Sequence, residues 1–186
     1  MNDTILSKIN KNWVEITLNR PDKLNSFNEE MHVALRSELE RACDSGMRVI
    51  LLTGAGRGFC AGQDLEDRDP SKTKSAPDLS QRLTKYYNPL IRLIRSLELP
   101  VICAVNGVAA GAGVNIALAC DIVLAAGSAK FIQSFSKVGL VPDTGGSWSL
   151  TQLLGEARAK GLALTGEPVT AKKSAGMGDD LEGRAR

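Results

Sequence analysis

The chain has 186 residues, of which 43% are hydrophobic and 24% charged, a composition typical of a globular domain rather than a disordered chain. The net charge is +2 and aromatic residues make up 4%, so the chain offers no basic patch and few stacking side chains for nucleic acid, which we exclude as a partner. Each long apolar stretch is interrupted before it reaches membrane-spanning length, and the first residues lack the pattern of a secretory signal. We therefore expect a cytoplasmic protein with no membrane segment.

The cysteines and the single histidine do not form a metal site by their spacing. Cys43, Cys60, Cys103 and Cys120 are far apart and form no C-x-x-C motif, so we expect reduced thiols that pack as small apolar side chains. His32 has no second histidine to act with, and we expect it on the surface of an early helix. The sequence predicts no bound metal.

The first half of the chain predicts a hairpin, a helix and a buried strand. Residues 5–9 and 13–18 alternate apolar and polar side chains around a polar turn, which indicates a β-hairpin. Asn28 is expected to begin a helix whose apolar positions recur at helical spacing, and Gly46 is expected to end it. Residues 49–53 predict a short strand that leads into a glycine-rich loop.

Strands and helices continue to alternate in the second half. The expected elements are a polar loop at 67–78, a helix at 86–97, a strand at 100–105, a short helix at 113–120, strands at 121–125 and 131–132, and helices at 145–154 and 156–164. This alternation predicts an α/β fold. The core is expected to cover residues 1–170, because residues 171–186 lose the apolar pattern and predict a disordered tail.

Two glycine-rich turns follow buried strands, at residues 54–58 and 107–113. The second contains G-x-G, but Ile116 stands where a dinucleotide-binding fingerprint needs a third glycine or alanine, and no Walker A motif occurs. Turns of this kind can expose backbone N–H groups that hold a developing negative oxygen. They can equally serve tight strand–helix packing, and spacing alone leaves both interpretations open.

Four linked motifs resemble the crotonase (enoyl-CoA hydratase/isomerase) superfamily in the family's order. They are LNRP with LN at residues 18–25, FCAGQDL at 59–65, PVICAVNGVAAGAG at 100–113 and VPDTGG at 141–146. The resemblance implies a superhelix of repeated ββα turns and an acyl-CoA substrate. It also implies an enzyme without a separate cofactor, since coenzyme A is part of the substrate. Full-length relatives are expected to form homotrimers or dimers of trimers, whereas this chain is expected to assemble poorly, because segments that build the family trimer lie beyond it.

The resemblance also implies site residues. The oxyanion donors fall on the backbone N–H groups of Gln63 and Ala112. The positions where family members line the coenzyme A groove are Lys23, Leu24, Ala61, Gly62, Asp64, Leu65 and Gly111.

Departures from the family pattern limit which of the family's reactions this chain is expected to catalyse. Hydratases of the family carry two glutamates that activate water, and these fall on Asn115 and Phe135, which cannot exchange a proton as carboxylates do. The acid that remains is Asp143, just before a predicted helix. It can be the catalytic acid/base group or merely the N-cap of that helix.

The finer pattern resembles a branch of the family that isomerises aryl epoxides on coenzyme A thioesters in aerobic phenylacetate degradation. In that branch the aspartate of the Pro-Asp motif transfers the proton. The implied reaction expands a 1,2-epoxyphenylacetyl thioester to an oxepin, and the branch also shifts the double bond of dehydroadipyl-CoA. The alternatives are another enzyme of the hydratase/isomerase type, a dehalogenase in which Asp143 would be the nucleophile, and an inactive remnant that binds acyl-CoA esters. The remnant is considered because family members continue for several helices beyond this region.

Overall fold

Two β-sheets and the helices around them form the molecule. The computed structural model describes residues 3–64 and 79–177. The strands of the larger sheet are β1 (Ile5–Asn10), β2 (Trp13–Leu18), β3 (Val49–Gly54), β5 (Val101–Val105) and β7 (Ile122–Ala125), in that spatial order. The smaller sheet has the order β4 (Gly58–Cys60), β6 (Val108–Ala110), β8 (Lys130–Ile132) and β9 (Val169–Thr170).

The chain alternates between the two sheets as it proceeds. Each of the successive pairs β3–β4, β5–β6 and β7–β8 places one strand in the larger sheet and the next in the smaller sheet. Within each sheet these strands are parallel neighbours, and only β1–β2 and β8–β9 pair antiparallel. The predicted α/β superhelix of ββα turns is therefore present.

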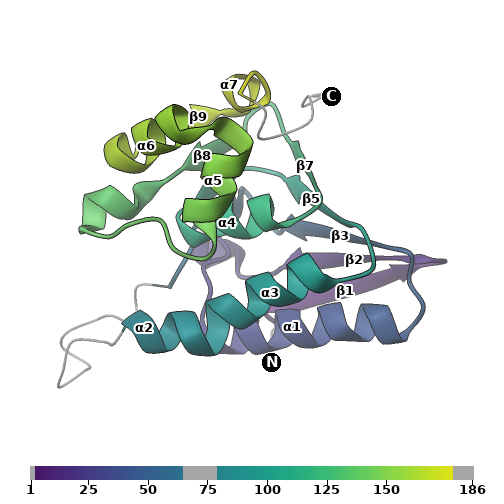
Figure 1. Cartoon of the computed structure of the whole chain (residues 1–186). Helices are drawn as coiled ribbons and strands as arrows, with labels where there is room; N and C mark the ends of the chain where they lie inside the picture. Colours follow the sequence, from purple (N-terminus) through teal and green to yellow (C-terminus); the bar gives the residue numbers. More distant parts are fainter. Residues whose placement is uncertain (1–2, 65–78, 178–186) are drawn as a thin grey trace.

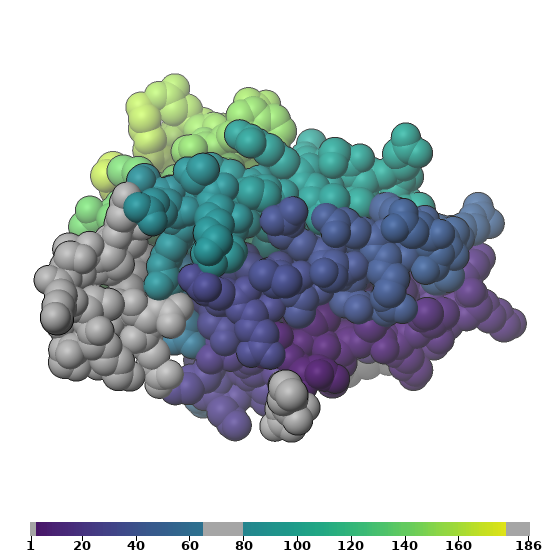
Figure 2. All heavy atoms as spheres, turned by 90° about the horizontal axis from the view of Figure 1, so that it is seen from below, coloured from purple at the N-terminus to yellow at the C-terminus, as the bar shows by residue number. Residues whose placement is uncertain are grey.

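Helices enclose this core on several sides (Figure 1). Their bounds are α1 (Glu29–Asp44), α2 (Leu79–Arg82), α3 (Asn88–Ser96), α4 (Ala112–Ala119), α5 (Gly146–Leu154), α6 (Glu156–Thr165) and α7 (Ala171–Ala175). Helices α1 and α3 lie side by side on the face seen in Figure 2. Helix α4 runs through the interior, and each of its eight residues is buried. Among the described residues, no helix is both long enough and apolar enough to cross a membrane.

Local sequence patterns explain why the first elements form where they do. In β2 and β3 alternate residues are buried, as the period of a strand that covers one face requires. Helix α1 buries Met31, Leu35 and Leu39 at helical spacing, and the Asn28 side chain caps it by accepting a hydrogen bond from the backbone N–H of Met31 at 2.9 Å. The predicted hairpin and helix are confirmed.

Two features differ from the sequence predictions, and a third prediction is not tested. The helical segment expected at residue 86 begins at Leu79, with a π-helical turn at Leu83–Tyr87 between α2 and α3. The expected polar loop at 67–78 lies outside the described residues. Order also continues past residue 170, because α7 buries Ala171 and Ser174 and its first N–H donates to Ala129 O at 3.1 Å. The rest of the expected tail, residues 178–186, lies outside the described residues.

Candidate active site

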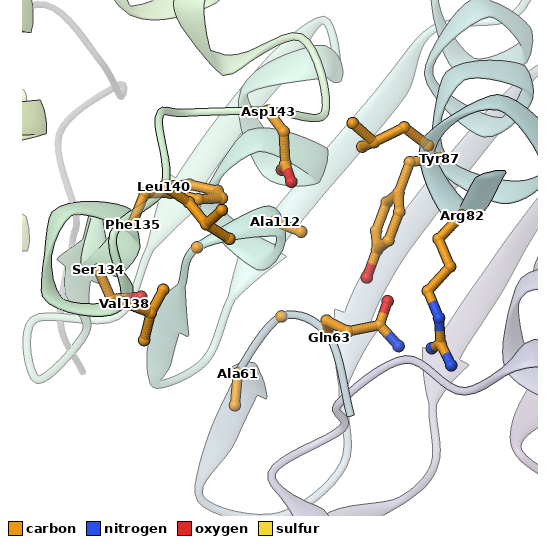
Figure 3. Close-up of a pocket in the computed structure, with 13 residues that line it drawn as sticks. Ala61, Gln63, Arg82, Tyr87, Ala112, Ser134, Phe135, Val138, Leu140 and Asp143 are labelled. Carbon is orange, nitrogen blue, oxygen red and sulfur yellow. The ribbon is translucent and has the colours of Figure 1, made fainter. Parts of the chain in front are cut away.

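A pocket opens where the ends of β4 and β6, the start of α4 and the helical segment at 79–87 meet. It holds about 750 Å³ of empty space, part of it open to solvent. The loop after β4 contributes Ala61, Gly62 and Gln63, and the start of α4 contributes Gly111 and Ala112 (Figure 3). Five of the residues predicted from the sequence therefore lie together on one wall.

The backbone around Gln63 is held by a short pairing with Phe27. The N–H of Phe27 donates to Gly62 O at 2.7 Å, and the N–H of Asp64 donates to Phe27 O at 3.0 Å. In a parallel pairing, alternate residues point their N–H groups to opposite sides. The Gln63 N–H consequently has no backbone acceptor within the described part of the chain, and it belongs to the pocket wall.

Ala112 is the first residue of α4, so its N–H has no acceptor inside the helix. The preceding N–H, that of Gly111, donates to Ile132 O at 2.9 Å and fixes the turn. The two loops are in direct contact, since a Cβ placed on Gly62 would lie 3.3 Å from the Ala112 nitrogen. Two N–H groups without backbone acceptors among the described residues thus belong to residues that line one pocket, and the helix N-terminus adds partial positive charge there.

Asp143 enters the pocket from the opposite side, on the loop before α5, and its side chain points toward Ala112 (Figure 3). Its carboxylate accepts a hydrogen bond from Thr144 Oγ1 at 2.7 Å. Helix α5 begins at Gly146 and its N-cap residue is Gly145, with no side-chain cap bond. The alternative in which Asp143 caps this helix is therefore wrong. Asp143 is the only carboxylate among the described residues that line the pocket.

An apolar wall lies beside the carboxylate. Phe135, Val138 and Leu140 come from the 3₁₀ turn at Ser134–Val138 and the loop after it. Phe135, at a position where hydratases of the family have a glutamate, is 7% exposed and lines the pocket. Asn115, at the other such position, is fully buried behind the wall.

Sequence reasoning missed the third side of the pocket. Arg82, Leu83 and Tyr87 line it from the segment that contains the π-helical turn. A π turn inserts one extra residue and turns neighbouring side chains to a new direction, often at functional sites. The adjacent aromatic pair, Tyr86 and Tyr87, was the available signal for this side of the pocket.

Three of the predicted residues that the structure describes do not line this pocket. Lys23 and Leu24 lie at the end of a 3₁₀ turn, and Leu24 O accepts the Ala61 N–H at 2.9 Å. Asp64 forms an ion pair with Arg20. Leu65 lies outside the described residues. Their predicted contacts with coenzyme A remain predictions.

His32 is not at the surface, so that expectation is wrong. Its side chain is 2% exposed and packs against the rings of Phe27, Tyr86 and Tyr87, at centroid distances of 4.7, 5.3 and 4.4 Å. Burial, together with the positive charges of Arg82 and Arg36, lowers the pKa of His32 from 6.5 to about 3. The imidazole is therefore neutral at physiological pH and supports Tyr87 from behind.

One cysteine, Cys60, lies next to the site and is fully buried. Cys60 lies directly under the glycine-rich wall, and burial raises the pKa of its thiol to about 12. All four cysteines are free thiols, and three of them are buried.

Comparisons with known proteins agree on one family. The family model described as enoyl-CoA hydratase/isomerase matches residues 8–178. The 1,2-epoxyphenylacetyl-CoA isomerase of Escherichia coli is 55% identical over 175 residues, which cover 94% of this chain and 67% of that protein. The chain thus spans about two thirds of the length of this relative.

Solved structures give the same result. An enoyl-CoA hydratase from Polaromonas sp. JS666 superimposes with a TM-score of 0.86 at 34% identity, over 97% of this chain and 70% of that one. An enoyl-CoA hydratase from Thermoplasma volcanium superimposes with a TM-score of 0.88 at 29% identity, over 100% of this chain and 73% of that one.

Proposed function

The chain belongs to the enoyl-CoA hydratase/isomerase family, and we propose that it is an isomerase of coenzyme A thioesters. Its substrate would be a 1,2-epoxyphenylacetyl thioester that expands to an oxepin thioester, with double-bond shifts in dehydroadipyl-CoA as a related activity. The Escherichia coli relative, whose name states the first of these substrates, supports the choice.

One observation carries this proposal: among the described residues, one carboxylate and two backbone N–H groups without backbone acceptors line opposite sides of a largely apolar pocket. Asp143 stands on one side, and the N–H groups of Gln63 and Ala112 stand on the other. A thioester carbonyl bound between the two N–H groups would present its α-carbon to the carboxylate.

This arrangement suits proton transfer next to a thioester. Removal of the α-proton places negative charge on the carbonyl oxygen, and two fixed N–H donors stabilise that charge without reorganising. The carboxyl of Asp143 then returns the proton at another carbon, so that product and substrate have the same composition. One acid/base group is sufficient, because no water is added.

The apolar wall favours isomerisation over hydration. Hydration needs a second polar group to orient water, and Phe135 occupies one of the two family positions for such a group. Its ring and the Leu140 side chain restrict the space for water beside Asp143.

We also propose the remaining features of the whole protein from the family. The groove for coenzyme A would include Lys23, Leu24, Ala61, Gly62 and Gly111, together with Asp64 and Leu65. No separate cofactor would take part, full-length members of the family would assemble as a trimer or a dimer of trimers, and the free thiols of this chain suit the cytoplasm.

The test is turnover of a 3-enoyl-CoA ester and of the epoxyphenylacetyl thioester in deuterated water. We expect conversion to the 2-enoyl and oxepin products. Because the abstracted proton is partly returned, we expect less than one deuterium per 2-enoyl product. A 3-hydroxyacyl product would identify a hydratase instead and contradict the proposal.

The alternative of an inactive remnant is tested in the same samples. It predicts that calorimetry detects binding of the CoA ester while no product forms.

A further inference from the structure

Asn115 lies one helical turn after Ala112 in α4, and both halves of its amide are engaged. Its Nδ2 donates to the backbone oxygen of Asp143 at 2.8 Å, and its Oδ1 accepts from Gln133 Nε2 at 2.9 Å. Asn115 is fully buried and Gln133 is 4% exposed. Because one partner is an acceptor and the other a donor, the amide can satisfy both in a single orientation.

The loop that Asn115 contacts has an unfavourable backbone conformation. Thr144 has a φ of 53°, in the left-handed region that residues with a side chain rarely adopt, and Gly145 follows with a φ of 76°. The Asp143 oxygen also accepts the Gly146 N–H at 2.7 Å. A loop of this kind keeps its shape only when surrounding contacts determine it, and the hydrogen bond from Asn115 provides such a contact between α4 and the loop backbone.

Close packing at the start of α5 adds to this contact. A Cβ on Gly146 would lie 2.2 Å from Asn115 Nδ2, so the first residue of α5 sits directly against this amide. The start of α5, the Asp143 loop and the middle of α4 therefore meet at Asn115.

We propose that Asn115 is a positioning residue that fixes the position of the Asp143 carboxylate relative to the Ala112 N–H. This inference rests on the function proposed above, because Asn115 acts only through Asp143. Helix α4 carries both the oxyanion donor and the amide, about 4.5 Å apart along the helix axis at 1.5 Å per residue. The acid/base group and the oxyanion donor are thus fixed to one rigid helix, even though 31 positions of sequence separate Asp143 from Ala112.

The most informative variant is Asn115→Asp. It keeps the size of the side chain and the acceptor for Gln133, but it replaces the donor toward Asp143 with a second acceptor. The matched control is Ile116→Val, at the next position of the same helix, which is also fully buried but has no bond to the Asp143 loop. Gln133→Met frees the amide without adding a charge and serves if Asn115→Asp does not fold.

We expect Asn115→Asp to lower the kcat of thioester isomerisation by about 10- to 100-fold, a share of the effect of losing a positioned acid/base group. KM should change by less than about threefold, because Asn115 does not line the pocket. Ile116→Val should keep kcat within about twofold even if its melting temperature falls. Gln133→Met should lower kcat by about 2- to 10-fold.

A mutant cycle separates positioning from a general structural effect. In an Asp143→Asn background, Asn115→Asp should change the residual rate by less than about twofold, because the group that it positions is gone. Full multiplication of the two losses would overturn the positioning role. The positioning role would also be overturned if folded Asn115→Asp kept an unchanged kcat while Asp143→Asn stayed inactive. If Asn115→Asp does not fold, an unchanged kcat of Gln133→Met has the same meaning. Full activity of Asp143→Asn itself would overturn the proposed function and this inference together.

Discussion

Arg20 and Asp64 form an ion pair beside the pocket, with Nη2 of Arg20 at 2.8 Å from Oδ2 of Asp64 and side-chain exposures of 17% and 7%. Arg20 also donates to Ser26 O through Nη1 at 2.5 Å. The pair joins the turn after β2 to the residue that follows Gln63. Asp64 thus has a structural role that its family motif alone did not reveal.

Removing one charge of this pair should cost stability. Asp64→Asn leaves the largely buried guanidinium of Arg20 without its counter-charge, so we expect the free energy of unfolding to fall by about 3 kcal/mol. The control, Asp22→Asn, changes an exposed acid in the adjacent turn and should cost less than about 0.5 kcal/mol. Urea unfolding of both variants provides the measurement, and equal small losses would show that the pair contributes nothing.

His32 should make stability depend on pH. Its pKa in the folded state is about 3, against 6.5 for an ordinary histidine. Below about pH 6.5, His32 therefore binds a proton in the unfolded chain but stays neutral in the folded chain. Its contribution to stability is complete above about pH 6.5 and falls as the pH drops toward 3, by up to about 1.4 kcal/mol per pH unit.

His32→Leu removes this titration while keeping an apolar side chain of similar size. Chemical unfolding of both proteins at about pH 7 and about pH 5 should show a larger loss for the wild type. If both lose the same stability over this interval, then His32 is protonated in the folded protein and the burial argument fails.

Gly62 and Gly46 form a natural pair for testing the oxyanion wall. Both have left-handed backbones, with φ values of 92° and 68°. A Cβ on Gly62 would lie 2.9 Å from Ala110 O and 3.3 Å from the Ala112 nitrogen, whereas a Cβ on Gly46 would meet nothing within 4 Å.

Gly46→Ala should therefore cost only the backbone strain, about 1–2 kcal/mol, and leave turnover unchanged. Gly62→Ala should cost more stability and also lower kcat by about 10²–10³-fold, because it displaces an oxyanion donor. Steady-state kinetics and thermal melting of the two variants test this. Comparable turnover in both would show that the Ala112 N–H is not part of the machinery.

Local sequence patterns were sufficient to predict those helices and strands whose own side chains show a clear period. The hairpin at residues 5–18 and the helix at 29–44 follow from the period of their own side chains and from the Asn28 cap. The three-residue strands β4, β6 and β8 are too short to show a period, and only the last was suspected. They form because parallel neighbours in the smaller sheet pair with them.

In the site, too, some residues could be predicted from nearby sequence and others depended on segments far along the chain. The spacing of the glycines left tight packing and anion binding both open, and Gln63 and Ala112 were selected only by the resemblance to the family's motifs. The position of His32 could not be derived in this way, since Tyr86 and Tyr87 cover it from a segment more than 50 positions later in the chain. Whether Asp143 is an N-cap also depended on where α5 begins, and the left-handed conformations of Thr144 and Gly145 move that start to Gly146.

The central claim is that Asp143 transfers the proton, and the substitution Asp143→Asn tests it most directly. The amide keeps the size of the side chain and can still accept the Thr144 hydroxyl, but it cannot take up and return a proton. We predict that turnover of the 3-enoyl and epoxyphenylacetyl thioesters falls by roughly 10²–10⁴-fold, with a nearly unchanged melting temperature and unchanged binding of the CoA ester. The control, Asp44→Asn at the exposed end of α1, should keep full turnover. Turnover of the Asp143→Asn protein close to that of the control would contradict the account.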